Sequence, residues 1–173
     1  MKGRLSSLFL AGVLIAAVVP AFAAKPARNH DPFAGTWKLN PQKSRYPHGA
    51  CPKRMTIVME AAGEGVRYRS ETIYADGNSS RSEYIADYSG RESIVVGSAG
   101  LLLPVSLKRV DAYTVVARYM RGLQIVATSR RHVSTDGRLL TITTTSPDNL
   151  GKKVTTIGVY GKTNEVAGLE ARQ

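Results

Sequence analysis

Cysteine is almost absent from this 173-residue sequence, because Cys51 carries its only thiol. A single cysteine cannot form a disulfide within the chain, so packing alone must stabilise the fold. We expect Cys51 to be a half-buried loop thiol, and the alternatives are a reactive thiol or pairing between two chains.

Long apolar runs are also missing, with one exception near the N-terminus. Lys2 and Arg4 precede an apolar stretch over residues 8–19, and Ala21 and Ala23 follow at the spacing of a signal-peptidase site. The stretch is shorter than the ~20 residues that span a bilayer. We therefore predict a signal peptide over residues 1–23, a periplasmic or secreted mature protein, and no stable membrane insertion after cleavage.

Motifs of catalysis, metal binding and phosphate binding are absent from the sequence. It contains no Gly-x-Ser-x-Gly elbow, no phosphate loop and no His-Glu-x-x-His pair. His30, His48 and His132 lack the spacing of a metal site, and His48 with Cys51 would supply only two ligands. We predict a non-enzymatic protein without a cofactor or a metal.

No block of basic residues occurs, although the net charge is +11 and loss of Lys2 and Arg4 leaves +9. The densest basic groups are three pairs, Lys108-Arg109, Arg130-Arg131 and Lys152-Lys153. Such scattered charge argues against a nucleic-acid partner. A positive excess still attracts anionic molecules, so an anionic surface or a protein partner stays open.

A helical period is lacking too, and short β-branched runs alternate with turn residues instead. Asp76-Gly77 and Asp136-Gly137 are typical hairpin turns, because their backbone needs the positive φ that Gly and Asp tolerate. The runs predict strands near residues 35–39, 54–61, 65–74, 80–88, 92–97, 104–110, 113–121, 123–133, 138–146 and 152–161.

This order of strands and turns predicts an all-β fold with a single antiparallel meander β-barrel of about eight to ten strands. Closing the sheet into a barrel removes the two edge strands that consecutive hairpins would leave. We place the barrel domain at residues 33–162, between a flexible leader over residues 24–32 and a loose tail over residues 163–173.

The first predicted strand carries Gly35-Thr36-Trp37. This run resembles the Gly-x-Trp signature with which lipocalins, fatty-acid-binding proteins and other calycins open their first strand. The wider stretch from Asp31 to Ser44 is similar to a family of uncharacterised bacterial exported lipocalin-like proteins. The resemblance implies a barrel that binds a small, largely apolar molecule, and it carries no known reaction.

The resemblance also implies a structural role for Gly35 and Trp37, in which the indole plugs one end of the barrel. In lipocalins an arginine from a late strand lies across that tryptophan. Arg130 and Arg131 are the candidates here, and we favour Arg131 because alternation places it on the face of Leu123, Ile125, Ala127 and Val133.

Period-two counting along the other strands gathers tyrosines and an arginine on the inner face. The candidate ligand-binding residues are Tyr68, Tyr84, Tyr88, Tyr113, Tyr119, Arg109 and Arg131. Tyrosine offers an apolar body with a polar tip, and arginine binds carboxylates through two hydrogen bonds. The alternative is that both arginines pack structurally, over Trp37 or against Asp87 or Glu83.

Two functional hypotheses follow from this pattern. The first is a binding protein that holds a small lipophilic ligand with an anionic head inside the barrel. The second is an interaction or inhibitor module with a filled barrel and a basic outer surface. A cavity of ~300–1,000 Å³ would favour the first hypothesis.

Overall fold

The computed structural model describes residues 31–47, 51–98, 103–148 and 150–163. The predicted signal peptide over residues 1–23 lies outside these ranges, as do leader residues 24–30 and tail residues 164–173. The one helix in the described part is the short 3-10 turn η1 (Pro41–Lys43), and no helix there is long and apolar enough to cross a membrane.

The described chain is an all-β protein, and every ladder in it is antiparallel. The strands are β1 (Gly35–Leu39), β2 (Arg54–Ala62), β3 (Gly65–Ile73), β4 (Ser79–Asp87), β5 (Ser89–Ser93), β6 (Val96–Gly97), β7 (Val105–Asp111), β8 (Thr114–Arg121), β9 (Gln124–Val133), β10 (Leu139–Pro147) and β11 (Lys153–Thr163). The predicted fold class is therefore confirmed, and most predicted strands agree with the structure within two residues.

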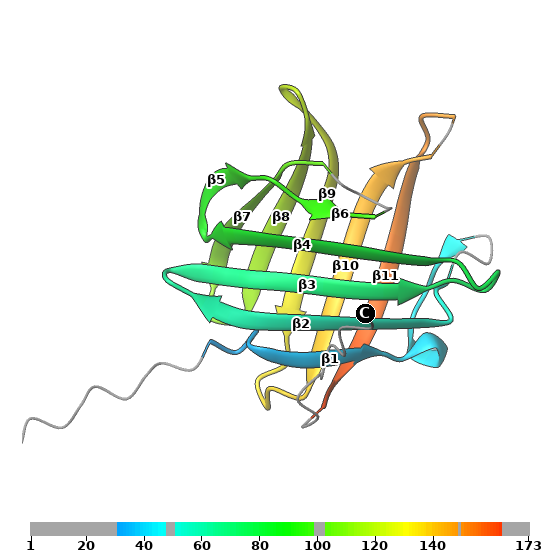
Figure 1. The fold of residues 1–173 in the computed structure, drawn as a ribbon, viewed down its shortest axis with the longest axis horizontal. Helices are drawn as coiled ribbons and strands as arrows, with labels where there is room; N and C mark the ends of the chain where they lie inside the picture. Colours follow the sequence, from blue (N-terminus) through cyan, green and yellow to red (C-terminus); the bar gives the residue numbers. More distant parts are fainter. Residues whose placement is uncertain (1–30, 48–50, 99–102, 149, 164–173) are drawn as a thin grey trace, which may run out of the picture.

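One sheet of 11 strands contains all of these elements, in the order β5-β7-β8-β9-β10-β11-β1-β2-β3-β4-β6. Figure 1 shows that the sheet curls on itself into two layers, with β1–β4 crossing in front of β7–β11 at a steep angle. Consecutive strands pair from β1 to β4 and from β7 to β11, as in a meander, and β11 pairs with β1. Side chains that point between the two layers form the interior of the barrel.

The strand predicted over residues 92–97 is divided in the structure. Its first part belongs to β5, which pairs with β7, and its last part forms β6, which pairs with β4. Ile94 and Val95 lie between the two parts. A single segment therefore lines both edges of the sheet, which is why the prediction of one strand was wrong there. We call this segment, residues 89–97, the seam.

Because neighbouring strands are antiparallel, each connection between two strands lies at one of the two ends of the barrel. The turns β3–β4, β8–β9 and β10–β11 and the helix η1 lie at one end, which we call the mouth. The turns β2–β3, β7–β8 and β9–β10 and the start of β1 lie at the other end, which we call the base. Gly77 at the mouth and Gly137 at the base have φ of 87° and 69°, as expected of the two predicted Asp-Gly hairpin turns.

The hydrophobic core fills the base. Its largest fully buried side chains include Trp37, Phe33, Leu107 and Leu140. Phe33 lies just before β1, and the other three side chains come from β1, β7 and β10. Together they exclude water from this part of the barrel. The mouth half is lined differently, and it contains the candidate site.

Candidate ligand-binding cavity

A cavity of about 290 Å³ lies inside the mouth half of the barrel. Its wall is rich in hydroxyl groups. The serines and threonines that line it are Ser70, Thr72, Ser80, Ser82, Ser129, Thr144 and Thr156, and the tyrosines are Tyr46, Tyr68, Tyr74, Tyr84, Tyr119 and Tyr160. Pro52, Met55, Val95 and Ile142 supply apolar surface, and Arg131 supplies the only charge among the lining residues.

The β-ladder explains how these hydroxyl groups meet. In the β3–β4 register Ser70 lies opposite Ser82, and their hydroxyl oxygens are 2.8 Å apart. Between β9 and β10, Ser129 lies opposite Thr144, and their hydroxyl oxygens are 2.5 Å apart. Each hydroxyl pair satisfies part of its own hydrogen-bonding capacity and keeps lone pairs for a guest.

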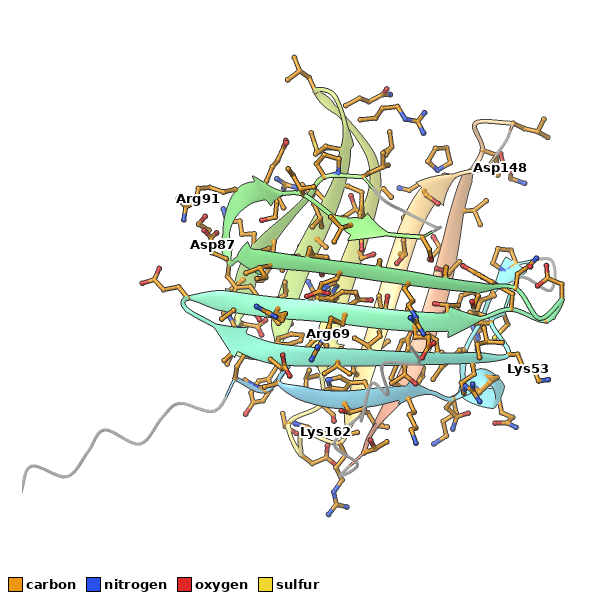
Figure 2. The ribbon with its side chains drawn as sticks, viewed as in Figure 1. Lys53, Arg69, Asp87, Arg91, Asp148 and Lys162 are labelled. Atoms are coloured by element: carbon orange, nitrogen blue, oxygen red, sulfur yellow. The ribbon has the colours of Figure 1, made fainter. Side chains whose placement is uncertain are left out.

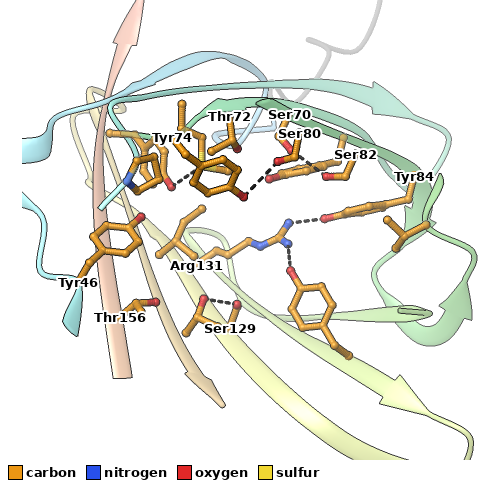
Figure 3. Close-up of a pocket in the computed structure, with 18 residues that line it drawn as sticks. Tyr46, Ser70, Thr72, Tyr74, Ser80, Ser82, Tyr84, Ser129, Arg131 and Thr156 are labelled. Atoms are coloured by element: carbon orange, nitrogen blue, oxygen red, sulfur yellow. Dashed lines mark hydrogen bonds between the residues drawn. The ribbon is translucent and has the colours of Figure 1, made fainter. Parts of the chain in front are cut away.

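Arg131 of β9 reaches from one layer of the barrel to the other (Figure 3). Its Nη1 donates to the phenol oxygen of Tyr84 at 2.5 Å, and its Nη2 donates to that of Tyr119 at 3.2 Å. The guanidinium carbon lies 5.0 Å from the ring centre of Tyr68, a cation–π contact. The ring of Tyr68 in turn stacks on that of Tyr84, with centroids 4.7 Å apart and planes 10° apart.

The charge of Arg131 is buried without a counter-ion. The residue is 3% exposed, and no carboxylate in the described part of the chain forms an ion pair with it. Its Nε also lacks a hydrogen-bond partner. Asp87 and Glu83, the alternative partners expected from the sequence, instead pair with Arg91 and Arg67.

The surroundings keep Arg131 cationic and its neighbouring tyrosines neutral. Burial works to lower the pKa of Arg131, but the phenol groups of Tyr84, Tyr119 and Tyr68 raise it by more. Burial raises the pKa of Tyr68 to about 12, with Arg131 opposing the shift. The cavity therefore presents one fixed positive charge amid neutral hydroxyl groups at physiological pH.

Trp37 is fully buried at the base, and its Nε1 donates to the carbonyl oxygen of Phe33 at 2.9 Å. The cation over its ring is Lys162 of β11, whose Nζ lies 5.0 Å from the ring centre. The expectation that Arg131 covers Trp37 was wrong, because the β1–β11 register places Lys162 directly opposite Trp37. Gly35, at φ 137°, makes room for the Lys162 side chain, since a Cβ there would lie 2.5 Å from its Cε.

Arg109 lies at the base, away from the cavity. Its Nη2 donates to Asp31 Oδ2 at 2.9 Å, and the hydroxyl of Tyr88 donates to the same oxygen at 2.8 Å. The guanidinium stacks 4.0 Å from the ring centre of Tyr88. Asp31 neutralises the charge of Arg109.

A wider hollow of about 560 Å³ surrounds this ion pair at the base and includes Glu64 and Ala112. Of the predicted ligand-binding residues, Arg131, Tyr68, Tyr84 and Tyr119 line the mouth cavity, and Arg109, Tyr88 and Tyr113 do not. Tyr113 is half-buried and packs against the base core.

Sequence reasoning missed part of the cavity wall. Ser129 lies two residues before Arg131 on β9, so the same alternation would have placed it inward. Tyr46 follows η1 in the loop before β2, where strand alternation gives no information. Ile125 and Leu123 were wrongly placed on the inner face, because a register shift between Tyr119 and Met120 turns them outward.

Metal and thiol chemistry find little support in this site. Within the described ranges no group of three or more His, Cys, Asp or Glu side chains could hold a metal ion. Cys51 is half-buried, and its Sγ lies 3.6 Å from the carbonyl oxygen of Pro52. Burial raises the pKa of the Cys51 thiol, so it is protonated at neutral pH and is not an activated nucleophile.

Comparisons with known proteins give structural similarity without sequence similarity. No protein-family model matches the sequence, and no curated protein matches it. The zebrafish ileal bile-acid-binding protein complexed with cholic acid is 11% identical, with a TM-score of 0.48 over 76% of this chain and 99% of that chain. Apocrustacyanin C2 is 14% identical, with a TM-score of 0.40 over 81% of this chain and 66% of that chain.

Proposed function

We propose that the protein is an exported, non-enzymatic binding protein that holds one small organic anion in the mouth cavity. The anionic group would accept hydrogen bonds from Arg131, and the body of the ligand would lie against the tyrosine rings and the few apolar side chains. The signal-peptide pattern of residues 1–23 supports export.

The observation that carries this proposal is the buried guanidinium without a counter-ion. Burial of an isolated charge costs several kcal/mol, so such groups are normally paired with an opposite charge. Arg131 is partnered only by neutral phenol groups and keeps an unpartnered Nε. A carboxylate in the adjacent cavity would supply the missing negative charge and two strong acceptor oxygens.

The volume of the mouth cavity and the residues that line it limit which ligands can bind. A volume of about 290 Å³ lies at the lower edge of the ~300–1,000 Å³ typical of small-molecule sites, so the ligand must be compact. The many hydroxyl groups favour a body with its own hydrogen-bonding groups over a purely hydrocarbon chain. The expected ligand is therefore more polar than the lipophilic molecule that the sequence pattern favours.

The cavity also supports one of the two functional hypotheses over the other. A module with a filled barrel would leave no such space, whereas here the mouth half keeps a cavity of about 290 Å³. We therefore prefer the binding protein to the interaction module.

Calorimetric titration with pairs of ligands of equal shape tests the proposal. Each pair consists of a small carboxylic acid and its neutral amide, for example an aromatic hydroxy acid and the matching amide. Charge-assisted hydrogen bonds contribute about 1.5–3 kcal/mol, so we expect the acid to bind about ten- to a hundredfold more tightly.

Arg131→Met should abolish this preference, and Arg109→Met should keep it because Arg109 lies at the base. Equal binding of acid and amide by the unaltered protein, or a preference that survives Arg131→Met, would refute the proposal. Native mass spectrometry of the protein from its exporting host would identify a natural ligand that co-purifies.

A further inference from the structure

Two leucines at the mouth project into solvent. Leu123 in the β8–β9 turn is 101% exposed and Leu150 in the β10–β11 turn is 93% exposed. Since β9 pairs with β10, these two hairpins are neighbours, and both tips extend beyond the rest of the barrel in Figure 1. One exposed leucine needs no explanation, but exposed apolar side chains that group at one end of a molecule are a feature of interaction sites.

Basic side chains surround these leucines and the rest of the mouth. Arg121, Lys152 and Lys153 flank them, and across the mouth stand Lys43, Arg45, Lys53 and Arg54. No ion pair involves any of these side chains within the described residues. Their charges therefore add to one positive field at this end of the molecule.

The carboxylates of Asp148 and Asp76 at the mouth accept hydrogen bonds from the backbone of their own turns. Asp148 accepts hydrogen bonds from the backbone nitrogens of Leu150 and Lys152, each at 2.9 Å. Asp76 accepts one from the backbone nitrogen of Asn78 at 3.0 Å. Neither carboxylate is paired with one of the mouth cations.

The charges at the base are more balanced. Arg91 pairs there with Asp87 and Arg109 pairs with Asp31, whereas Lys108 and Arg138 form no ion pair within the described residues. Further carboxylates, Glu64, Asp111 and Asp136, stand at its turns. Figure 2 shows Lys53 at the mouth and the Asp87–Arg91 pair at the opposite end. Clustered unpaired cations and the two most exposed leucines of the described residues thus coincide at the mouth.

We infer that the mouth docks on the surface of a lipid bilayer that contains anionic lipids. Leu123 and Leu150 enter the interfacial region, and the basic side chains around them contact the headgroups. A bilayer matches this surface for two reasons. Leu123 and Leu150 lie on separate turns, and both can enter a fluid apolar layer at the same time. The basic side chains are spread around the mouth, and anionic headgroups are spread over the membrane surface in the same way. Docking in this orientation turns the cavity toward the lipid, and it does not depend on what the cavity holds.

Vesicle flotation of the protein without residues 1–23, a form that contains the whole described fold, tests this inference. We expect binding to vesicles of equal phosphatidylglycerol and phosphatidylcholine, and at least tenfold weaker binding to phosphatidylcholine alone. The double variant Leu123→Ser, Leu150→Ser should lose at least tenfold in partitioning. The control variant Val110→Ser, Leu139→Ser removes exposed apolar residues at the base and should change it less than twofold.

A second pair of variants distinguishes docking through the mouth from a general attraction of the positively charged protein to anionic vesicles. Lys152→Glu, Lys153→Glu and Lys108→Glu, Arg138→Glu change the net charge equally, but only the first alters the mouth. One basic residue near an anionic membrane contributes about fivefold to partitioning, so the mouth variant should lose well over tenfold and the base variant far less. Equal losses from the two pairs, or no preference for anionic vesicles, would overturn the inference.

Tryptophan fluorescence tests the docking orientation independently. The emission of Leu123→Trp should shift to shorter wavelength with anionic vesicles, and that of Val110→Trp should not, while the fully buried Trp37 gives a constant background. Similar shifts for the two reporters would contradict the proposed orientation. Arg131→Met should dock like the unaltered protein, so loss of ligand binding and loss of docking can be told apart.

Discussion

Arg131 and Tyr84 join the two layers of the barrel through a hydrogen bond of 2.5 Å, although their strands, β9 and β4, share no ladder. Both side chains are buried, so the bond connects a buried cation to a neutral phenol. It orients the guanidinium toward the cavity, but it does not neutralise the charge. Several expected properties of the protein follow from this arrangement.

Removal of the charge should leave the ligand-free protein at least as stable as before. Methionine in place of a buried, uncompensated cation removes the cost of its desolvation and keeps most of the volume. We expect Arg131→Met to raise the free energy of unfolding by about 0–2 kcal/mol in urea titrations. Arg131→Ala should lower it, because the smaller side chain also leaves a void. A loss above about 1 kcal/mol for the methionine variant would show that Arg131 serves stability.

The hydroxyl of Tyr84 should be important only while Arg131 is present. Tyr84→Phe leaves Nη1 of Arg131 without its acceptor, and a buried unsatisfied donor costs about 1–3 kcal/mol. In an Arg131→Met background the same change should cost less than about 0.5 kcal/mol, which a double-mutant cycle in urea measures. Equal costs in the two backgrounds would mean that the two side chains do not interact.

Gly35 should tolerate no side chain. Its φ of 137° is a conformation that L-residues avoid, and a Cβ there would approach Cε of Lys162 to 2.5 Å. We expect Gly35→Ala to lower the free energy of unfolding by about 1–3 kcal/mol. Gly161→Ala on β11 is the matched control, because a Cβ there meets nothing within 4 Å. Thermal unfolding of the two variants compares them directly.

The tyrosines predict how stability depends on alkaline pH. Burial raises the folded pKa of Tyr68 from 10.0 to about 12, and that of Tyr84 still further. Above pH 10 the unfolded chain loses phenol protons that the folded protein keeps, so ionisation favours unfolding. This contribution to stability should be complete below pH 10 and should be lost as the pH rises toward 12.

Phenolate absorbance provides the measurement for this prediction. Tyr68 and Tyr84 are buried, so they should ionise only with the loss of folded circular dichroism. Tyr68→Phe should make the decline in stability between pH 10 and 12 shallower. A single absorbance transition near pH 10 with the fold intact would contradict the assigned burial.

The sequence predicted strand positions well and contacts poorly, for a physical reason. Alternation reports which face of a strand a residue occupies, so Tyr68, Tyr84 and Arg131 were correctly placed inside. It does not report how far along the barrel axis the residue lies. Arg109 and Arg131 therefore looked equivalent, although one pairs with Asp31 at the base and the other faces the mouth cavity.

Register and bulges limited the prediction further. Lys162 covers Trp37 because β11 pairs with β1, a contact between residues at opposite ends of the chain. The shift near Met120 reverses the faces at the start of β9, which simple counting cannot detect. The missing counter-ion of Arg131 likewise becomes visible only when the surrounding strands are in place.

The seam has a mechanical consequence. In the described chain β4 and β7 share no ladder. On the sides that face each other, β4 pairs only with β6 and β7 only with β5, two short parts of the segment over residues 89–97. Everywhere else around the barrel, adjacent strands are held by ladders of four or more residue pairs. Widening the barrel there breaks the fewest backbone hydrogen bonds, so amide exchange should be fastest along this line. A guest larger than the resting cavity would be admitted by parting of the wall at this weak line, with the base acting as the hinge.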